Sequence, residues 1–231
     1  MNNSLTEEQV KVLNMSQSVI NEVRKVIIGK DEIIIKVLLS ILAGGHILIE
    51  DIPGVGKTTL AVALSKALSL DYKRLQFTPD VLPTDVTGFT ILNKETHKFE
   101  YKQGAALTNL FLADEINRTS SKTQSALLEV MEEGKVTVDG ITHKMPDPYI
   151  VIATQNPVGS IGTQMLPESQ MDRFIVRNTM GYTNLESEVA MLKSKQNLVP
   201  VDNVRPVVSA EDILQERKVV DNIYASAQAF Q

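Results

Sequence analysis

Residues 46–59 read His46-Ile-Leu-Ile-Glu-Asp-Ile-Pro-Gly-Val-Gly-Lys-Thr-Thr59, an apolar run followed by a glycine-rich turn, a lysine and two threonines. The run His46–Glu50 is typical of a buried strand, and the Ala- and Leu-rich stretch Thr58–Ser69 predicts a helix. Glycines between a strand and a helix let several backbone N–H groups point inward at the helix N-terminus, where the helix dipole favours anions. The stretch therefore predicts a loop that binds a triphosphate.

The polar side chains of this loop suit ATP and a magnesium ion. Lys57 is expected to reach the β- and γ-phosphates, and the Thr58 hydroxyl to complete a water-rich Mg²⁺ shell. The common pattern G-x-x-x-x-G-K-[ST] has a glycine where this chain has Asp51, so a Pro-Gly turn before an ordinary helix stays an alternative. Thr59 is expected mainly to cap the helix. The residues of the loop predicted to bind the nucleotide are Pro53, Gly54, Val55, Gly56, Lys57, Thr58 and Thr59.

Two acidic residues, Asp114 and Glu115, directly follow the apolar run Leu110–Ala113. Acids beside a buried strand are costly unless they have a function. In enzymes with such a loop, the strand-terminal Asp orients Mg²⁺ and an adjacent Glu takes a proton from the attacking water. We therefore predict that Thr58 and Asp114 hold the metal and that Glu115 is the general base. Two ordinary surface acids at a strand end are the alternative.

Two further polar residues are candidates for the same site. Asn156 follows the strand Tyr149–Thr154, and its amide is expected to hydrogen-bond the γ-phosphate or the attacking water; an Asn-Pro turn is the alternative. Arg173 precedes another apolar run and is a candidate for the phosphate of a neighbouring subunit. Its alternative is a surface ion pair with Asp172 or Glu168.

Composition excludes several classes of protein. The chain has 231 residues, 43% of them apolar and 22% charged, which is typical of a globular protein. It has no cysteine, so disulfides, thiol nucleophiles and Cys-ligated metals are excluded. No signal peptide is recognisable and the most apolar stretch, Ile33–Ala43, is too short to cross a bilayer, so we expect a cytoplasmic protein without a membrane partner. The net charge of −5 makes nucleic acid an unlikely partner.

Strands and helices alternate up to about residue 180, which predicts an α/β fold with a parallel sheet. The dipeptide Asp139-Gly140 between two β-prone runs indicates a hairpin, and residues 78–109 are expected to form an inserted hairpin or loop. The further segments expected are helices from Thr6 to Gly29, Asp31–Ala43 and Ser121–Glu133, strands Lys73–Phe77 and Phe174–Met180, and helix caps at Thr183–Glu186 and Ser209–Asp212.

Six motifs in this order make the chain resemble the MoxR family of AAA+ ATPases over residues 26–181. The motifs are Leu42–Thr58, Gln76–Pro83, Leu112–Arg118, Thr123–Glu129, Ala153–Pro157 and Leu166–Phe174. The resemblance implies a five-stranded parallel P-loop sheet with helices on both sides, inserts at Thr78–Gln103 and Lys135–Lys144, and a C-terminal helical lid. Accordingly we expect an AAA+ core over residues 1–181 and a partial lid over residues 182–231, since the chain ends at Gln231 within a helical pattern.

The resemblance also implies a function. It suggests an ATP hydrolase that needs Mg²⁺, assembles as a homo-oligomeric ring, expected to be a hexamer, and acts as a chaperone-like motor that remodels or matures protein clients, with a partner that carries a von Willebrand factor A domain. Asn156 then matches the sensor position, Arg173 the finger into the next subunit's site, and Arg118 a second interface residue. The residues expected to act in catalysis are Lys57, Glu115, Asn156 and Arg173, and those expected to bind the nucleotide include Asp114, Glu115 and Asn156.

One function of another class stays open: a module that binds ATP and signals to a partner with little turnover. A GTPase is less favoured, because Asn93-Lys-Glu-Thr96 lacks the final acid of the guanine-reading motif, and an ABC-type ATPase because no Leu-Ser-Gly-Gly-Gln stretch is present.

Overall fold

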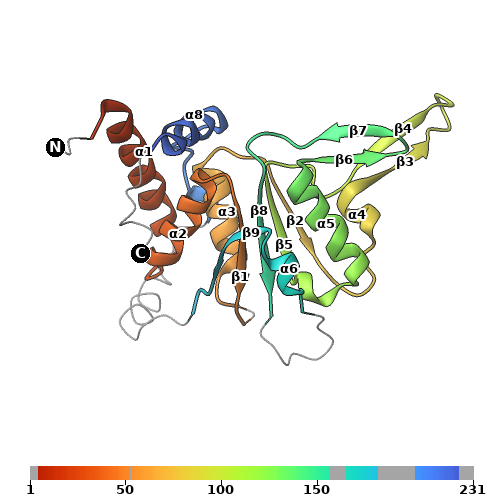
Figure 1. The fold of residues 1–231 in the computed structure, drawn as a ribbon, viewed down its shortest axis with the longest axis horizontal. Helices are drawn as coiled ribbons and strands as arrows, with labels where there is room; N and C mark the ends of the chain where they lie inside the picture. The colour runs from red at the N-terminus through yellow and green to blue at the C-terminus, as the bar shows by residue number, and fades with distance from the viewer. Residues whose placement is uncertain (1–4, 53, 157–164, 182–200, 224–231) are drawn as a thin grey trace.

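The computed structural model describes residues 5–52, 54–156, 165–181 and 201–223. In these ranges five parallel strands form the central sheet in the order β2-β5-β8-β1-β9 (Figure 1). Their bounds are β1 His46–Glu50, β2 Tyr72–Gln76, β5 Leu110–Asp114, β8 Ile150–Gln155 and β9 Phe174–Asn178. The predicted α/β fold with a parallel sheet is therefore confirmed.

The central strands are apolar on both faces, as parallel strands covered by helices must be. Every residue of β5 and of β8 is buried. Along β1, Ile47 and Ile49 pack on one side of the sheet and Leu48 packs on the other. Successive side chains of a strand point to opposite faces, so the continuous apolar runs seen in the sequence supply two cores at once.

Helices cover both faces of the sheet (Figure 1). On one side lie α1 (Glu7–Arg24), α2 (Asp31–Leu42) and α3 (Lys57–Ala67), and on the other lies α5 (Ser121–Glu133). α1 begins at the predicted capping box of Thr6 and Gln9 but ends at Arg24 instead of Gly29. The N–H groups of Val26 and Ile27 both donate to the carbonyl of Val23, and this tightened turn closes the helix early.

Two antiparallel hairpins extend from the side of α5 (Figure 1). β3 (Gly88–Leu92) pairs with β4 (Phe99–Gln103), and β6 (Lys135–Val138) pairs with β7 (Ile141–Lys144), so both expected inserts contain hairpins. The ring of Tyr101 stacks on that of His143, with 3.8 Å between centroids, and joins the two hairpins.

Short helices link these elements. They are α4 (Pro83–Thr87), α6 (Glu168–Met171) and the 3-10 turns η1 (Ile116–Arg118) and η2 (Val201–Asn203). The sequence did not predict α4; Pro83 at its first position and the bond from the Leu82 N–H to the Asp85 carboxylate begin it. The helix expected over Ser121–Glu133 is present as α5, and the hydroxyl that caps it belongs to Ser120, the residue before its first.

The described part of the C-terminal segment packs on the helices of the core. α8 (Ala210–Asp221) begins at the predicted cap Ser209 and lies against α1 and α2. The N–H groups of Val207 and Val208 donate to the carbonyl of Ala67 at the end of α3, at 2.9 and 3.1 Å. The predicted cap Thr183–Glu186 lies outside the described residues, and the division into a core and a lid at Gly181 stays a prediction. In the described ranges, no helix has both the length and the apolar character that crossing a membrane requires.

The packing of α8 can be tested at Ile213, whose side chain is completely buried. We expect Ile213→Ala to lower the free energy of unfolding by about 2–5 kcal/mol, because it leaves a cavity in the core. The control is Ile223→Ala: Ile223 is 54% exposed, so the change should cost no more than about 0.5 kcal/mol. Urea titration measures both values, and equal losses for the two variants would show that α8 does not pack on the core.

Candidate functional site

A cleft of about 310 Å³ lies at the carboxyl edge of the sheet, where β2 and β5 end beside the start of α3. Residues from the glycine-rich loop and from both strand ends line it: Gly54, Gly56, Lys57, Thr58, Thr59, Arg74, Gln76, Asp114 and Glu115. Most of the residues predicted to bind the nucleotide or the metal therefore lie together in this cleft. They are Gly54, Gly56, Lys57, Thr58 and Thr59 from the loop, and Asp114 and Glu115 from the end of β5. Parallel strands bring such residues together, because their carboxyl ends share one edge.

The loop itself has the backbone that anion binding needs. Gly54 and Gly56 have positive φ angles of 89° and 98°, a region that other residues rarely adopt. Gly56 precedes the first residue of α3 and has no side chain to cap the helix, so the first N–H groups of α3 are free of a side-chain cap. Pro53, also predicted to bind the nucleotide, lies outside the described residues.

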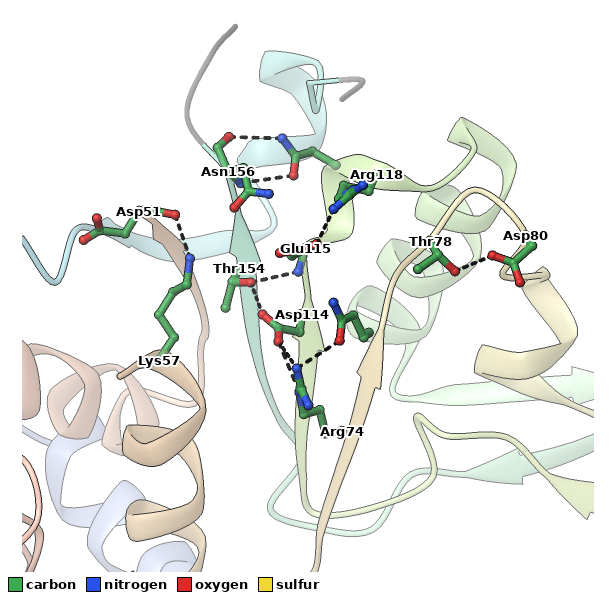
Figure 2. A network of polar contacts seen from close by, with 12 residues as sticks. Asp51, Lys57, Arg74, Thr78, Asp80, Asp114, Glu115, Arg118, Thr154 and Asn156 are labelled. Atoms are coloured by element: carbon green, nitrogen blue, oxygen red, sulfur yellow. Dashed lines mark hydrogen bonds and ion pairs between the residues drawn. The ribbon is translucent and has the colours of Figure 1, made fainter. Parts of the chain in front are cut away.

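Lys57 is held beside this helix start. Its Nζ donates to the carbonyl of Asp51 at 2.7 Å (Figure 2). Burial lowers the pKa of Lys57, and the nearby charges of Asp114, Asp51 and Glu115 oppose that shift. The ammonium group therefore lies in a partly desolvated position among acidic groups, where an anionic ligand gains more from it than in water.

Asp51, which replaces the first glycine of the common pattern, has a structural role. Its carboxylate accepts the N–H of Gly181 at 2.7 Å and that of Ile52 at 2.8 Å. Its own N–H donates to the carbonyl of Gln155 at 3.1 Å. Asp51 thus joins the end of β1 and the loop to the end of β8 and to the chain beyond β9. Asp51, in place of the usual glycine, therefore links neighbouring strand ends through hydrogen bonds. The loop still leads directly into a helix.

Asp114 is buried and both of its carboxylate oxygens are engaged (Figure 2). Oδ1 accepts the hydroxyl of Thr154 at 2.6 Å. Oδ2 accepts two N–H groups of Arg74, from Nη2 at 2.6 Å and from Nε at 3.1 Å. The Asp114 carboxylate is the predicted metal ligand. In this structure its partners are a hydroxyl and a guanidinium.

Glu115 has a left-handed backbone, with φ 58° and ψ 45°, which is strained for a residue other than glycine. Its N–H donates to the Oγ1 of Thr154 at 2.8 Å, so one hydroxyl holds both acidic residues in place. Its carboxylate pairs with Arg118 at 3.2 Å. The strained turn directs the Glu115 side chain into the cleft wall while the chain leaves the sheet.

Asn156 lies at the end of β8 and is 6% exposed. The side chain of Asn117 accepts its N–H and donates to its carbonyl, each at 3.1 Å (Figure 2). Within the described part of the chain, the Asn156 Oδ1 atom is buried and has no hydrogen-bond partner. A buried amide oxygen is costly to leave unpaired, so this group suits a ligand or water at the edge of the site.

Arg173 is not among the residues that line the cleft. It forms an ion pair with Glu132 of α5, which differs from the alternative pairing with Asp172 or Glu168. Its side chain is 38% exposed, so it can reach another molecule. Its role as a finger into a neighbouring site stays a prediction.

Sequence analysis missed Arg74, Gln76 and Thr154. Arg74 and Gln76 are alternate residues of a strand that the sequence did predict, so period-2 spacing placed them on one face. Gln76 lies opposite Asp114 in the β2–β5 register. The identity of the neighbouring strand, which the sequence does not state, was the missing information.

Comparisons with known proteins agree with this geometry. The model of the ATPase family associated with various cellular activities (AAA) matches residues 46–176. The uncharacterized protein YeaC of Bacillus subtilis is 50% identical over 89% of this chain and 64% of its own length. The chaperone MoxR1 of Mycobacterium tuberculosis is 38% identical over 87% of this chain and 53% of its own length. The chain therefore spans between about half and two thirds of these relatives.

A solved structure supports the same assignment. The crystal structure of a candidate ATPase from Cytophaga hutchinsonii superposes with a TM-score of 0.86 and 41% identity, over 96% of this chain and 67% of that one. The expected P-loop fold of the AAA+ type is thereby confirmed. The chain belongs to the MoxR family of AAA+ ATPases.

Proposed function

We propose that this chain binds ATP with Mg²⁺ and hydrolyses it to drive a chaperone-like motor. The observation that carries the proposal is the cleft in which Lys57, Asp114 and Glu115 meet a helix start. A lysine, a metal-binding carboxylate and a candidate base at one such position are the parts that phosphoryl transfer to water needs. The chaperone name of a relative that is 38% identical supports the motor role.

The residues of the cleft fit a nucleotide. The N–H groups at the start of α3 and the Lys57 ammonium would hold the phosphates, because both offer positive charge in a partly desolvated loop. The buried Oδ1 of Asn156, which has no hydrogen-bond partner among the described residues, would accept a hydrogen bond from the attacking water, and the NH₂ of the same amide would donate to a phosphate oxygen. Gly54 and Gly56 allow the positive φ angles of the loop, and the space beside Gly54 is open, since a Cβ there would meet no atom within 4 Å.

The residues also fit a magnesium ion. Thr58 and Asp114 would hold it, through a hydroxyl and a carboxylate oxygen of the kinds that Mg²⁺ prefers. When bound, the ion neutralises negative charge on the phosphate oxygens. Thr154 keeps the Asp114 carboxylate in place with a hydrogen bond to Oδ1, and Oδ2, which accepts from Arg74 in this structure, would have to exchange that partner to hold the ion.

Glu115 is the proposed general base. Its N–H is fixed by Thr154, and Arg118 donates to only one of its carboxylate oxygens, Oε2, so Oε1 is the atom that would accept a proton from water. A positioned base contributes about 10²- to 10⁴-fold in rate. The Arg118 pair therefore positions the carboxylate of the proposed base.

The assembly that we propose is a homo-oligomeric ring, a hexamer by resemblance to the family. Arg173, 38% exposed, would enter the neighbouring subunit's site, where a guanidinium stabilises charge that develops on the transferred phosphate. Protein clients and a partner with a von Willebrand factor A domain are proposed on the same resemblance. A core of residues 1–181 and a partial lid of residues 182–231 complete the proposal.

A switch with little turnover is the second candidate. The observation in its favour is that both acidic residues of the site pair with arginines, Asp114 with Arg74 and Glu115 with Arg118. Such a site would bind ATP, but its metal ligand and its base would stay paired with arginines, and turnover would be slow.

Replacing the base distinguishes the two candidates. We expect Glu115→Gln to lower the hydrolysis rate at least about 10²-fold and to leave ATP affinity within about threefold, because the amide cannot accept the proton. Phosphate release and equilibrium binding measure the two quantities. Glu133→Gln, an exposed acid at the end of α5, is the control and should leave both unchanged. In a switch, by contrast, the rate would already be slow and Glu115→Gln would barely change it.

Assembly can be tested by protein concentration. We expect the Mg-ATP hydrolysis rate per subunit to rise with concentration, because each site needs an arginine from its neighbour. Arg173→Ala should lower the rate at high concentration by about 10³-fold or more while ATP still binds. Arg24→Ala is the matched control, because Arg24 is a partly exposed arginine in a surface ion pair with Asp31. A concentration-independent rate that Arg173→Ala leaves intact would rule out the shared site.

A further inference from the structure

Arg74 is a cation of the cleft to which neither the sequence motifs nor the family comparison gives a role. It lies on β2, two residues before Gln76, and so on the same face of the strand. Gln76 is directly opposite Asp114 on β5. The Oε1 atom of Gln76 accepts an N–H of Arg74 at 3.2 Å, which orients the guanidinium toward the carboxylate.

Arg74 occupies one of the two oxygens through which Asp114 could hold a metal ion. Two of its N–H groups donate to Oδ2 of Asp114, at 2.6 and 3.1 Å (Figure 2). The hydroxyl of Thr154 donates to Oδ1 at 2.6 Å and uses one acceptor direction of that oxygen. A carboxylate oxygen has two acceptor directions, and two N–H groups use both of them. A metal ion at Oδ2 and this guanidinium therefore exclude each other.

The guanidinium is able to move away. The Arg74 side chain is 40% exposed, whereas that of Asp114 is 10% exposed. An ion pair with one partner this exposed is weakly held, because water solvates the released cation. Arg74 also lines the same cleft as Lys57 and Thr58, so on release it remains beside the place where phosphates bind.

We propose that Arg74 is a second phosphate-binding cation, which holds Asp114 while no metal is present and binds a nucleotide phosphate when the metal takes Asp114. The planar fork of N–H donors that grips one carboxylate oxygen is equally suited to phosphate oxygens. The inference rests on the proposed function, because it assumes that ATP and Mg²⁺ occupy this cleft. It adds a residue whose partner depends on the metal.

The first test measures the metal alone, with Mn²⁺ as a probe for Mg²⁺ and electron paramagnetic resonance to count free ion. We expect Arg74→Gln to raise Mn²⁺ affinity about two- to fivefold, the range of a partly exposed ion pair, because the competitor is gone. Lys73→Gln removes the same charge from the preceding residue of β2, whose Nζ donates to the carbonyl of Gly104 at 3.4 Å. This control should leave Mn²⁺ affinity unchanged.

The second test measures a fluorescent, non-hydrolysable ATP analogue with Mg²⁺ and with EDTA. With Mg²⁺, Arg74→Gln should weaken binding about 10- to 100-fold, the loss of a charged hydrogen bond, and with EDTA it should have little effect. Arg74→Lys should lie between the two proteins, because it keeps the charge without the fork. Thermal melting checks that each variant is folded.

Three outcomes would overturn the inference. A Mn²⁺ affinity that stays unchanged or falls in Arg74→Gln would mean that Arg74 does not compete with the metal for Asp114. Equal losses of analogue binding with and without Mg²⁺ would mean that its role is not metal-dependent. A wild-type protein that binds neither Mn²⁺ nor the analogue would overturn the proposed function and this inference with it, whereas in the first two cases binding by the wild type leaves the proposed function standing.

Discussion

The parallel alignment of β2, β5, β8 and β1 is the constraint on which the site depends. It brings four strand ends to one edge, so residues far apart in the sequence, such as Lys57 and Asp114, line one cleft. The alignment is stable because helices bury both faces of the sheet and the strands supply apolar side chains to each face. Any change that shifted the register of β5 by one residue would turn Asp114 away from the cleft.

Polar groups at this edge largely satisfy one another. The Thr154 hydroxyl donates to Asp114 and accepts from the backbone of Glu115, so the two acids share one anchor. Each acid also has its own arginine, Arg74 or Arg118. Such pairing lowers the cost of burying carboxylates, since an unpaired charge would be strongly destabilising. A ligand that binds these carboxylates must therefore displace some of their present partners. The ion pairs with the arginines are the contacts that a nucleotide and a metal would replace.

Local patterns predicted much of the fold because the information is local. Apolar runs identified β1, β5 and β8, a capping box identified the start of α1, and Asp139-Gly140 identified the β6–β7 hairpin. The early end of α1, the helix α4 and the cap of α5 at Ser120 were not predicted. In each case several nearby donors and acceptors compete for the same hydrogen bond, and the sequence does not show which pair forms it. For the site, Lys57, Asp114 and Glu115 were found from motifs, whereas Arg74 was missed because its partner lies 40 residues away.

By itself, the sequence determined the strand–loop–helix unit at residues 46–67, the acidic pair after β5 and the family, because these depend on residue types at short spacing. Only the tertiary structure decided the strand order, the pairing of Arg74 with Asp114, the tie from Asp51 to Gly181 and the pairing of Arg173 with Glu132. Such contacts join segments that are distant along the chain. The physical reason is that strand neighbours are chosen by the packing of the whole sheet, which no short stretch encodes.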